Sequence, residues 1–154
     1  MKKKIFLWIL VLSWMGLIFY FSSRNSEEST NQSRAIINKT NIIEKYEKDK
    51  TPEEKEQILS SVDAKFRKVA HASVFLVLSI LVCFLVKEFT LDIKKILIIS
   101  AIICFLYACS DEVDQLYVVG RSGQVSDVII DNIGALVGYI IFYLSGKKIW
   151  RKSN

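Results

Sequence analysis

The 154-residue sequence is poor in residues that mark common kinds of site: it contains one proline, one histidine and three cysteines. One histidine without any C-x-x-C pair is too little for a zinc centre, so we expect neither a structural metal nor a cofactor. Cys83, Cys104 and Cys109 all lie in apolar segments. A free cysteine in such a segment acts as a small buried hydrophobe, and we expect no disulfide.

An even mixture of charged and apolar residues is also missing. Hydrophobic residues make up 51% of the chain and charged residues 24%, and the mean hydropathy is +0.30. The charges stand between long apolar runs, and this segregation is typical of membrane proteins. The net charge of +5 comes from basic residues that gather on no single helix or face. This placement argues against a nucleic-acid partner.

Four apolar runs predict membrane-spanning helices, over residues 5–21, 69–86, 96–117 and 128–145. The sequence therefore predicts an all-α, polytopic membrane protein with four transmembrane helices, forming one domain over residues 1–154. A signal peptide is the alternative interpretation of the first run. The length of that run and the lack of an A-x-A-like cleavage site favour an uncleaved helix.

The length of the third span decides where its acidic residues lie. Ile96 to Cys109 is only about 14 residues, which is too short to cross the hydrocarbon core. We therefore expect the helix to continue through Asp111 to about Tyr117. This continuation places Asp111 to Gln115 at or just inside the membrane boundary, where charged side chains are costly and mark functional sites.

Residues 22–68 form a polar loop between the first two spans. Thr51 and Glu54, with a proline at the first helical position, predict a helix start, and Ser29 and Gln32 resemble a second capping box. Apolar residues follow both signals at helical spacing. The loop is predicted to contain two amphipathic helices that lie on the bilayer or on the spans. A solvated connector with transient helix is the alternative.

Lysine and arginine counts predict the orientation. Residues 1–4, 87–95 and 146–154 carry three, three and four basic residues, whereas residues 111–127 carry one arginine and four acids. Short cytoplasmic loops are enriched in Lys and Arg. Both termini are therefore predicted to be cytoplasmic, and the 22–68 loop and the acid-rich turn are predicted to face outward.

Polar residues of several kinds gather around this acid-rich turn. Asp111 and Gln115 are four residues apart and share one face of the third helix, with Glu112 beside them. Arg121 stands between two glycines, and its guanidinium suits a carboxylate or phosphate partner. The sequence predicts a ligand-binding site formed by His71, Asp111, Glu112, Gln115, Arg121, Asp127 and Asp131.

Asp127 and Asp131 share one helical stripe with Gly134 and Gly138 on the fourth span. The two glycines form a G-x-x-x-G motif, which lets helix backbones approach closely. The acids are therefore expected to face protein rather than lipid, and a homo-oligomer through the glycines is a further expectation. For Asp127, a helix cap is as good an interpretation as a ligand role.

His71 opens the second span at the depth of these acids. An isolated histidine at a helix start is more often a structural hydrogen-bonding residue than a catalyst. Acids from two other spans are its expected neighbours, and a carboxylate would orient its ring. His71 therefore carries both interpretations, and with Glu112 it is a candidate catalytic residue.

At these residues the chain resembles the VanZ-like family of membrane proteins, named for an accessory protein of teicoplanin resistance. Asp114 stands where the family commonly has His, and Val119 where it commonly has Pro. The resemblance implies a four-span protein of the bacterial cytoplasmic membrane and a link to antibiotics that bind envelope precursors, but it supplies no reaction. It rests on Ser22, Ser23, Ser29, Ser33, Lys68, His71, Tyr107, Asp111, Glu112, Gln115, Gly120, Arg121, Asp127, Asp131, Gly134 and Gly138.

Three functions fit this pattern. The leading hypothesis is a cell-envelope accessory protein whose outward-facing pocket binds a membrane lipid or a lipid-linked envelope precursor and lowers susceptibility to lipoglycopeptides. The second is a hydrolase or transferase acting on a lipid head group, although no nucleophile elbow or metal motif supports it. The third is a structural role, in which the acids and Arg121 form a buried ion network that fixes helix packing.

Overall fold

The computed structural model describes residues 1–23, 51–118 and 124–150. These residues form four helices and no strand: α1 (Lys2–Ser22), α3 (Pro52–Lys87), α4 (Ile93–Gln115) and α5 (Val125–Trp150). Each of these helices is long and apolar enough to cross a membrane. The predicted all-α membrane protein with four spans is confirmed.

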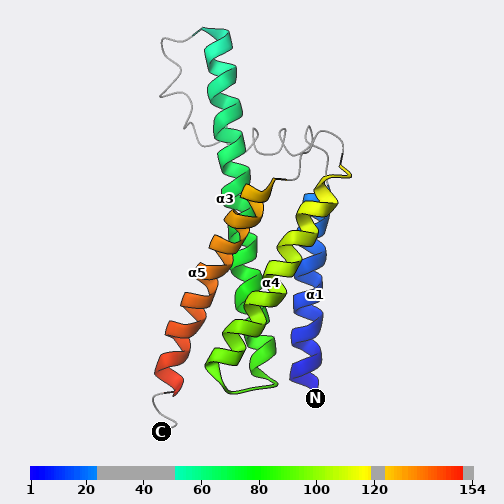
Figure 1. Ribbon diagram of the computed structural model, residues 1–154, viewed down its shortest axis with the longest axis vertical. Coiled ribbons are helices and arrows are strands. Elements are labelled where there is room, and N and C mark those ends of the chain that lie inside the picture. The colour runs from blue at the N-terminus through cyan, green and yellow to red at the C-terminus, as the bar shows by residue number, and fades with distance from the viewer. Residues whose placement is uncertain (24–50, 119–123, 151–154) are drawn as a thin grey trace.

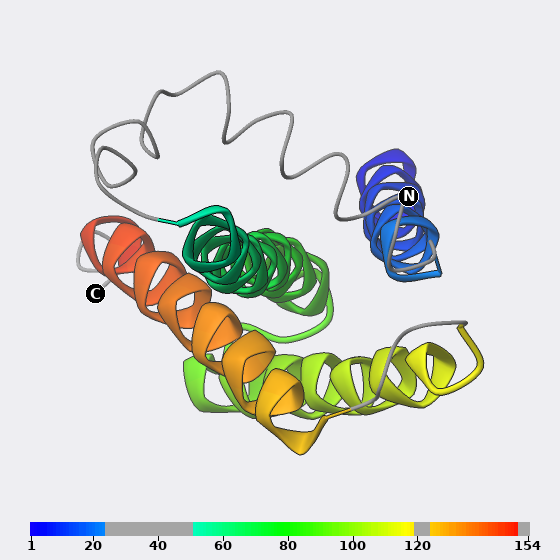
Figure 2. The same cartoon turned by 90° about the horizontal axis from the view of Figure 1, so that it is seen from above.

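Helix α3 is the centre of the bundle, because it packs against each of the other three helices. Helix α5 contacts α3 most extensively, and α4 contacts both of them. Helix α1 stands at the edge, beside α3 and α4, and α5 lies on the other side of α3 (Figure 2).

Helix α3 begins where the sequence predicts. The Oγ1 atom of Thr51 accepts a hydrogen bond of 3.3 Å from the backbone of Glu54, and the Glu54 carboxylate accepts one of 3.0 Å from the backbone of Thr51. The helix then runs unbroken to Lys87, so the amphipathic helix and the second span are one element. Its first half projects beyond the other helices (Figure 1). The helix predicted after Ser29 lies outside the described residues.

Helix α4 starts at a second cap and extends past the apolar run. The Asp92 carboxylate accepts a hydrogen bond of 2.9 Å from the backbone of Lys94. The helix does not stop at Cys109 but continues through Asp111 and ends at Gln115. The expected continuation is therefore correct, and it carries the acidic residues on a helix rather than on a loop.

Aromatic side chains join the helices through backbone carbonyl groups. Such bonds hold helices together where the surrounding solvent is apolar and the hydrophobic effect is weak. Each has an N–H or O–H donor on one helix and a carbonyl oxygen on another: Tyr107 Oη to Met15 at 2.5 Å, Trp14 Nε1 to Val74 at 3.0 Å, and Tyr139 Oη to Ser100 at 3.2 Å.

Apolar side chains fill the space between the helices and also cover their outer faces. Phe75, Leu78 and Val82 of α3 are fully buried. Ile98 and Ile102 of α4 are more than half exposed, and similar residues are exposed on every helix. A surface of this kind suits the hydrocarbon core of a bilayer.

An ion pair ties the start of α1 to the turn after α3. The Lys3 ammonium donates to the Glu88 carboxylate, and this hydrogen bond lowers the pKa of Glu88. The pair lies at the same end of the bundle as the chain's N-terminus and the last turns of α5 (Figure 1).

Candidate functional site

A cluster of polar side chains from all four helices lies near the opposite end of the bundle. Each helix contributes there at a different point along its length: α1 with its last residue, α3 near its middle, α4 with its last turn and α5 with its first two turns (Figure 1). This placement follows from the up-and-down order of the helices. Residues far apart in the sequence therefore form one cluster.

Ser22, Asp111 and Gln115 form a closed group of hydrogen bonds between α1 and α4. Ser22 Oγ donates to Asp111 Oδ2 at 2.9 Å, and Gln115 Nε2 donates to Asp111 Oδ2 at 3.1 Å and to Ser22 Oγ at 3.0 Å. The three residues are 1%, 1% and 6% exposed. Buried polar groups need such partners, since an unsatisfied one costs several kcal/mol in hydrocarbon.

His71 faces carboxylates from two other helices. Its Nδ1 atom lies 4.0 Å from Asp111 Oδ2 and 3.8 Å from Asp131 Oδ1. Both distances exceed the length of a direct hydrogen bond. The three side chains, from α3, α4 and α5, therefore face one another without a direct hydrogen bond from His71 Nδ1 to either carboxylate.

Asp131 is the most enclosed acid of the cluster. Its residue is 0% exposed, and among the described residues neither of its carboxylate oxygens has a hydrogen-bond partner. The second oxygen of Asp111, Oδ1, is in the same position. Buried carboxylates without donors are rare in folded proteins and require an explanation.

Glu112 joins the end of α4 to the start of α5. Its carboxylate accepts a hydrogen bond of 2.7 Å from the backbone nitrogen of Gln124, immediately before α5. Glu112 is 7% exposed. A charge-assisted bond of this kind fixes how the two helices meet.

Lys68 and Asp127 form an ion pair at the open side of the cluster. Lys68 Nζ donates to Asp127 Oδ1 at 2.6 Å, and the two side chains are 37% and 29% exposed. Asp127 stands in the first turn of α5, where a negative charge also complements the helix dipole.

Two glycines place Asp131 close to His71. A methyl group on Gly134 would lie 2.8 Å from Cα of Ala72 and would overlap its carbonyl oxygen. A methyl group on Gly138 would likewise overlap the Ser79 hydroxyl and the Leu76 carbonyl oxygen of α3. The G-x-x-x-G motif therefore brings α5 onto α3 within one chain. The homo-oligomer expected from this motif stays a prediction.

A family model described as VanZ/LLP1 matches residues 6–146. The chain belongs to the VanZ/LLP1 family. No curated protein matches it, and no solved structure does. The matched range includes all of the cluster residues described above, and the resemblance stated from the sequence is confirmed.

In this VanZ/LLP1 chain the structure brings most of the predicted site residues together. Asp111, Gln115 and Asp131 form the buried centre, the partly exposed His71 faces both aspartates, and Glu112 and Asp127 lie next to them. Arg121 lies outside the described residues. The role of the cluster in binding a ligand stays a prediction.

Sequence reasoning did not place Ser22 and Lys68 in the site. Ser22 had one signal, because it ends a run of apolar residues with a hydroxyl group and is part of the family resemblance. Lys68 had another, because it lies one helical turn before His71. Neither signal reveals its partner, which lies on a different helix.

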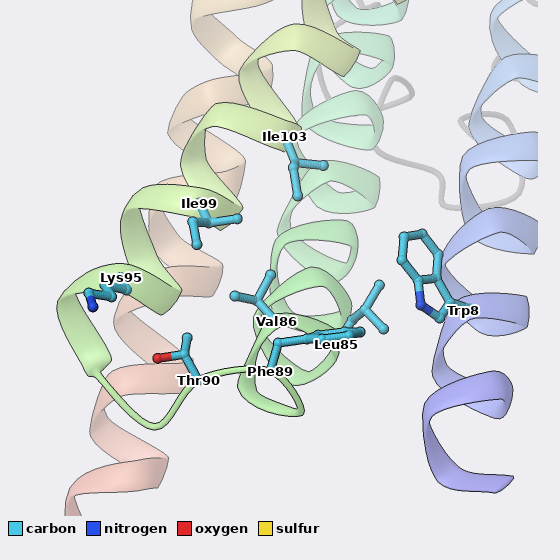
Figure 3. A pocket seen from close by; sticks show the side chains of 8 residues that line it. All are labelled: Trp8, Leu85, Val86, Phe89, Thr90, Lys95, Ile99 and Ile103. Carbon is cyan, nitrogen blue, oxygen red and sulfur yellow. The ribbon is translucent and has the colours of Figure 1, made fainter. Parts of the chain in front are cut away.

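An apolar pocket of about 300 Å³ lies at the other end of the bundle (Figure 3). Its walls come from α1, α3, α4 and the turn between α3 and α4. Lys95 is the one charged residue among those that line it. The pocket contains no acid or imidazole and is separate from the polar cluster, so it offers space but no reactive group.

Proposed function

We propose that the polar cluster is an outward-facing binding pocket of a cell-envelope accessory protein in the bacterial cytoplasmic membrane. Its ligand is a membrane lipid or a lipid-linked envelope precursor. Occupation of the pocket lowers susceptibility to teicoplanin-type lipoglycopeptides. Membership of the VanZ/LLP1 family supports an envelope role.

One observation carries this proposal: polar side chains of α1, α4 and α5 that converge beside His71 of α3 are almost completely buried. Ser22, Asp111 and Asp131 are each at most 1% exposed. A group of apolar residues would pack four helices together at lower free energy than buried carboxylates do. Acids kept at this depth in spite of that cost indicate a function beyond packing.

The outward orientation rests on charge. In the short segments, residues 1–4 and 87–95 carry three basic residues each at the end of the bundle with the N-terminus (Figure 1), whereas residues 111–127 carry one arginine and four acids. If that end is cytoplasmic, as Lys and Arg enrichment indicates, the polar cluster lies near the outer surface. A ligand from the outer leaflet then reaches it from the side of Lys68 and Asp127.

A second candidate function is an enzyme that transfers or hydrolyses a lipid head group. It is favoured by the position of His71 between two carboxylates, because such neighbours orient an imidazole for proton transfer. In this reading His71 or Glu112 is the general base and Arg121 holds an anionic group.

Two conservative substitutions test the site. Glu112→Gln and Arg121→Lys are expected to abolish the resistance phenotype in cells while the membrane abundance of the protein stays unchanged. Asp114→Asn is the matched control, because Asp114 is on the same helix but outside the buried group. If both variants instead lose the protein from the membrane, the cluster is a structural ion network.

The ligand and the reaction need separate measurements. Lipid mass spectrometry on purified wild-type protein should detect a co-purifying lipid that is depleted in Arg121→Ala. Turnover of an isolated lipid-linked precursor by the wild type, absent in Glu112→Gln, would establish the enzyme in place of the binding protein. Equal lipid content in wild type and Arg121→Ala would contradict the proposed role of Arg121.

A further inference from the structure

We infer that His71, Asp111 and Asp131 hold a divalent metal cation at the centre of the polar cluster. The part of the inference that concerns the lipid ligand rests on the proposed function. The cation site itself follows from the geometry of the three side chains. It departs from the expectation, drawn from the sequence, that the chain binds no metal.

The three side chains have the donor atoms and the spacing that a cation needs. Each offers one ligand atom, an imidazole nitrogen or a carboxylate oxygen, and these atoms all lie within 4.8 Å of one another. Three points so spaced fit within a circle of about 2.8 Å radius, and Zn²⁺ or Ca²⁺ ligands lie at about 2.0–2.6 Å. If each ligand atom moves about half an ångström toward the centre, which side-chain rotation allows, all three reach coordination distance.

The burial of Asp131 without hydrogen-bond donors is an independent indication of a bound cation. It is fully buried, and neither of its oxygens has a hydrogen-bond partner among the described residues. One of these oxygens faces His71 at 3.8 Å, too far for a hydrogen bond. A direct ion pair with a protonated histidine would instead close to about 2.7–2.9 Å. A cation between the two groups explains both the distance and the missing donors.

The charge of the cluster supports the same conclusion. Asp111 and Asp131 carry two carboxylates into a region where charge is costly. A divalent cation neutralises both and leaves the imidazole of His71 as a neutral ligand. Ser22 and Gln115 already donate to Asp111 Oδ2, and such bonds orient a carboxylate that coordinates a metal.

The ligand set narrows the choice of metal. One imidazole and two carboxylates suit first-row divalent ions such as Mn²⁺, Fe²⁺ or Zn²⁺, whereas an all-oxygen site would suit Mg²⁺ or Ca²⁺. Three protein ligands also leave coordination positions open. On the proposed function, these positions accept phosphate oxygens of a lipid head group, which the acids alone would repel.

Mn²⁺ binding to the purified protein tests the cation site. The protein is prepared in detergent, stripped with a chelator and titrated with MnCl₂, and free Mn²⁺ is followed by electron paramagnetic resonance. The wild type should bind one equivalent, and Asp131→Asn and His71→Gln should each weaken binding at least tenfold. Asp114→Asn removes a charge from the same helix end without removing a ligand, so it should bind like the wild type.

Thermal unfolding, measured without and with Mn²⁺, separates loss of the site from loss of the fold. Thermal unfolding without metal shows whether each variant is folded, and added Mn²⁺ should raise the midpoint of the wild type and of Asp114→Asn only. Equal Mn²⁺ binding by wild type, Asp131→Asn and His71→Gln would overturn the inference, as would no binding by folded wild-type protein.

The cation and the proposed function can fail separately. If the stripped wild type binds no Mn²⁺ but co-purifies with a lipid that Arg121→Ala lacks, the cation site is wrong and the binding pocket stands. If Mn²⁺ binds as expected but no lipid is found, the cation site stands and the proposed ligand is wrong.

Discussion

Ser22, the last residue of α1, donates a hydrogen bond of 2.9 Å to Asp111, 89 positions later in the chain. Helix α1 is the edge helix of the bundle and makes few contacts with α4. A buried polar bond therefore fixes one end of α1, while the ion pair of Lys3 and Glu88 holds the other. The polar cluster and the packing of α1 depend on each other.

Replacement of Ser22 by alanine is expected to loosen this attachment. The change removes a donor to Asp111 and an acceptor for Gln115, and a buried group left without its partner costs about 1–3 kcal/mol. The thermal midpoint in detergent should fall accordingly. Ser23→Ala is the neighbouring control, because Ser23 is exposed and bonds only to Phe19 of its own helix among the described residues. Equal effects of the two changes would contradict the role of Ser22.

The packing of α5 on α3 depends on Gly134. Alanine at this position would place a methyl group 2.8 Å from Cα of Ala72 and into its carbonyl oxygen, and both atoms belong to a helix backbone that cannot yield. We expect Gly134→Ala to destabilise the protein by about 1–3 kcal/mol or more and to lower its abundance in the membrane.

Gly16→Ala is the matched control for this substitution. A methyl group on Gly16 would meet no atom within 4 Å among the described residues, and Gly16 also lies in a membrane-spanning helix. Alanine is the better helix former by about 1 kcal/mol, so stability should be unchanged or slightly higher. A large loss in Gly16→Ala would show that the assay responds to any glycine replacement.

The sequence predicted the spans and several faces of the helices, because these depend on local order alone. Apolar length predicted four spans, and the shortness of the third predicted its continuation through Asp111. The spacing of Asp111 and Gln115 placed them on one face, and the structure joins them by a hydrogen bond of 3.1 Å.

The sequence predicted that acids of two other spans lie beside His71, and they do. Other contacts between helices were beyond its reach, because they depend on how each helix is rotated and tilted. The partners of Ser22 and Lys68 illustrate this limit: nothing near either residue in the sequence points to Asp111 or Asp127. The sequence also did not show that the helix before Val69 and the span after it are one element, and the start of the span near Val69 stays a prediction. Composition changes there from polar to apolar, but no residue interrupts the helix, so α3 continues.

The ion pair of Lys68 and Asp127 is expected to contribute little to stability despite its short distance. Lys68 is 37% exposed, so solvent and salt screen its charge. A double-mutant cycle with Lys68→Met and Asp127→Asn should give a coupling energy below about 1 kcal/mol. The coupling energy is calculated from the unfolding free energies of the wild type, the two single variants and the double variant, all measured in one detergent. A coupling of several kcal/mol would mean that the pair is shielded from water, contrary to its exposure.

The orientation of the bundle leads to the last prediction. Residues 1–4, 87–95 and 146–154 hold three, three and four basic residues. The N-terminus and the turn between α3 and α4 lie at one end of the bundle, whereas the start of α5 lies near the other (Figure 1). Two positions therefore settle the orientation: Leu91 in that turn, which is 79% exposed, and Ser126 in the first turn of α5.

Labelling with a membrane-impermeant maleimide measures the orientation. Single cysteines are introduced after Cys83, Cys104 and Cys109 are replaced by alanine. Ser126→Cys should be labelled in intact cells, and Leu91→Cys only after lysis, because positively charged segments are retained in the cytoplasm. The reverse pattern would place the polar cluster on the cytoplasmic side. A ligand from the outer leaflet would then not reach His71, and the proposed envelope function would fail with the orientation.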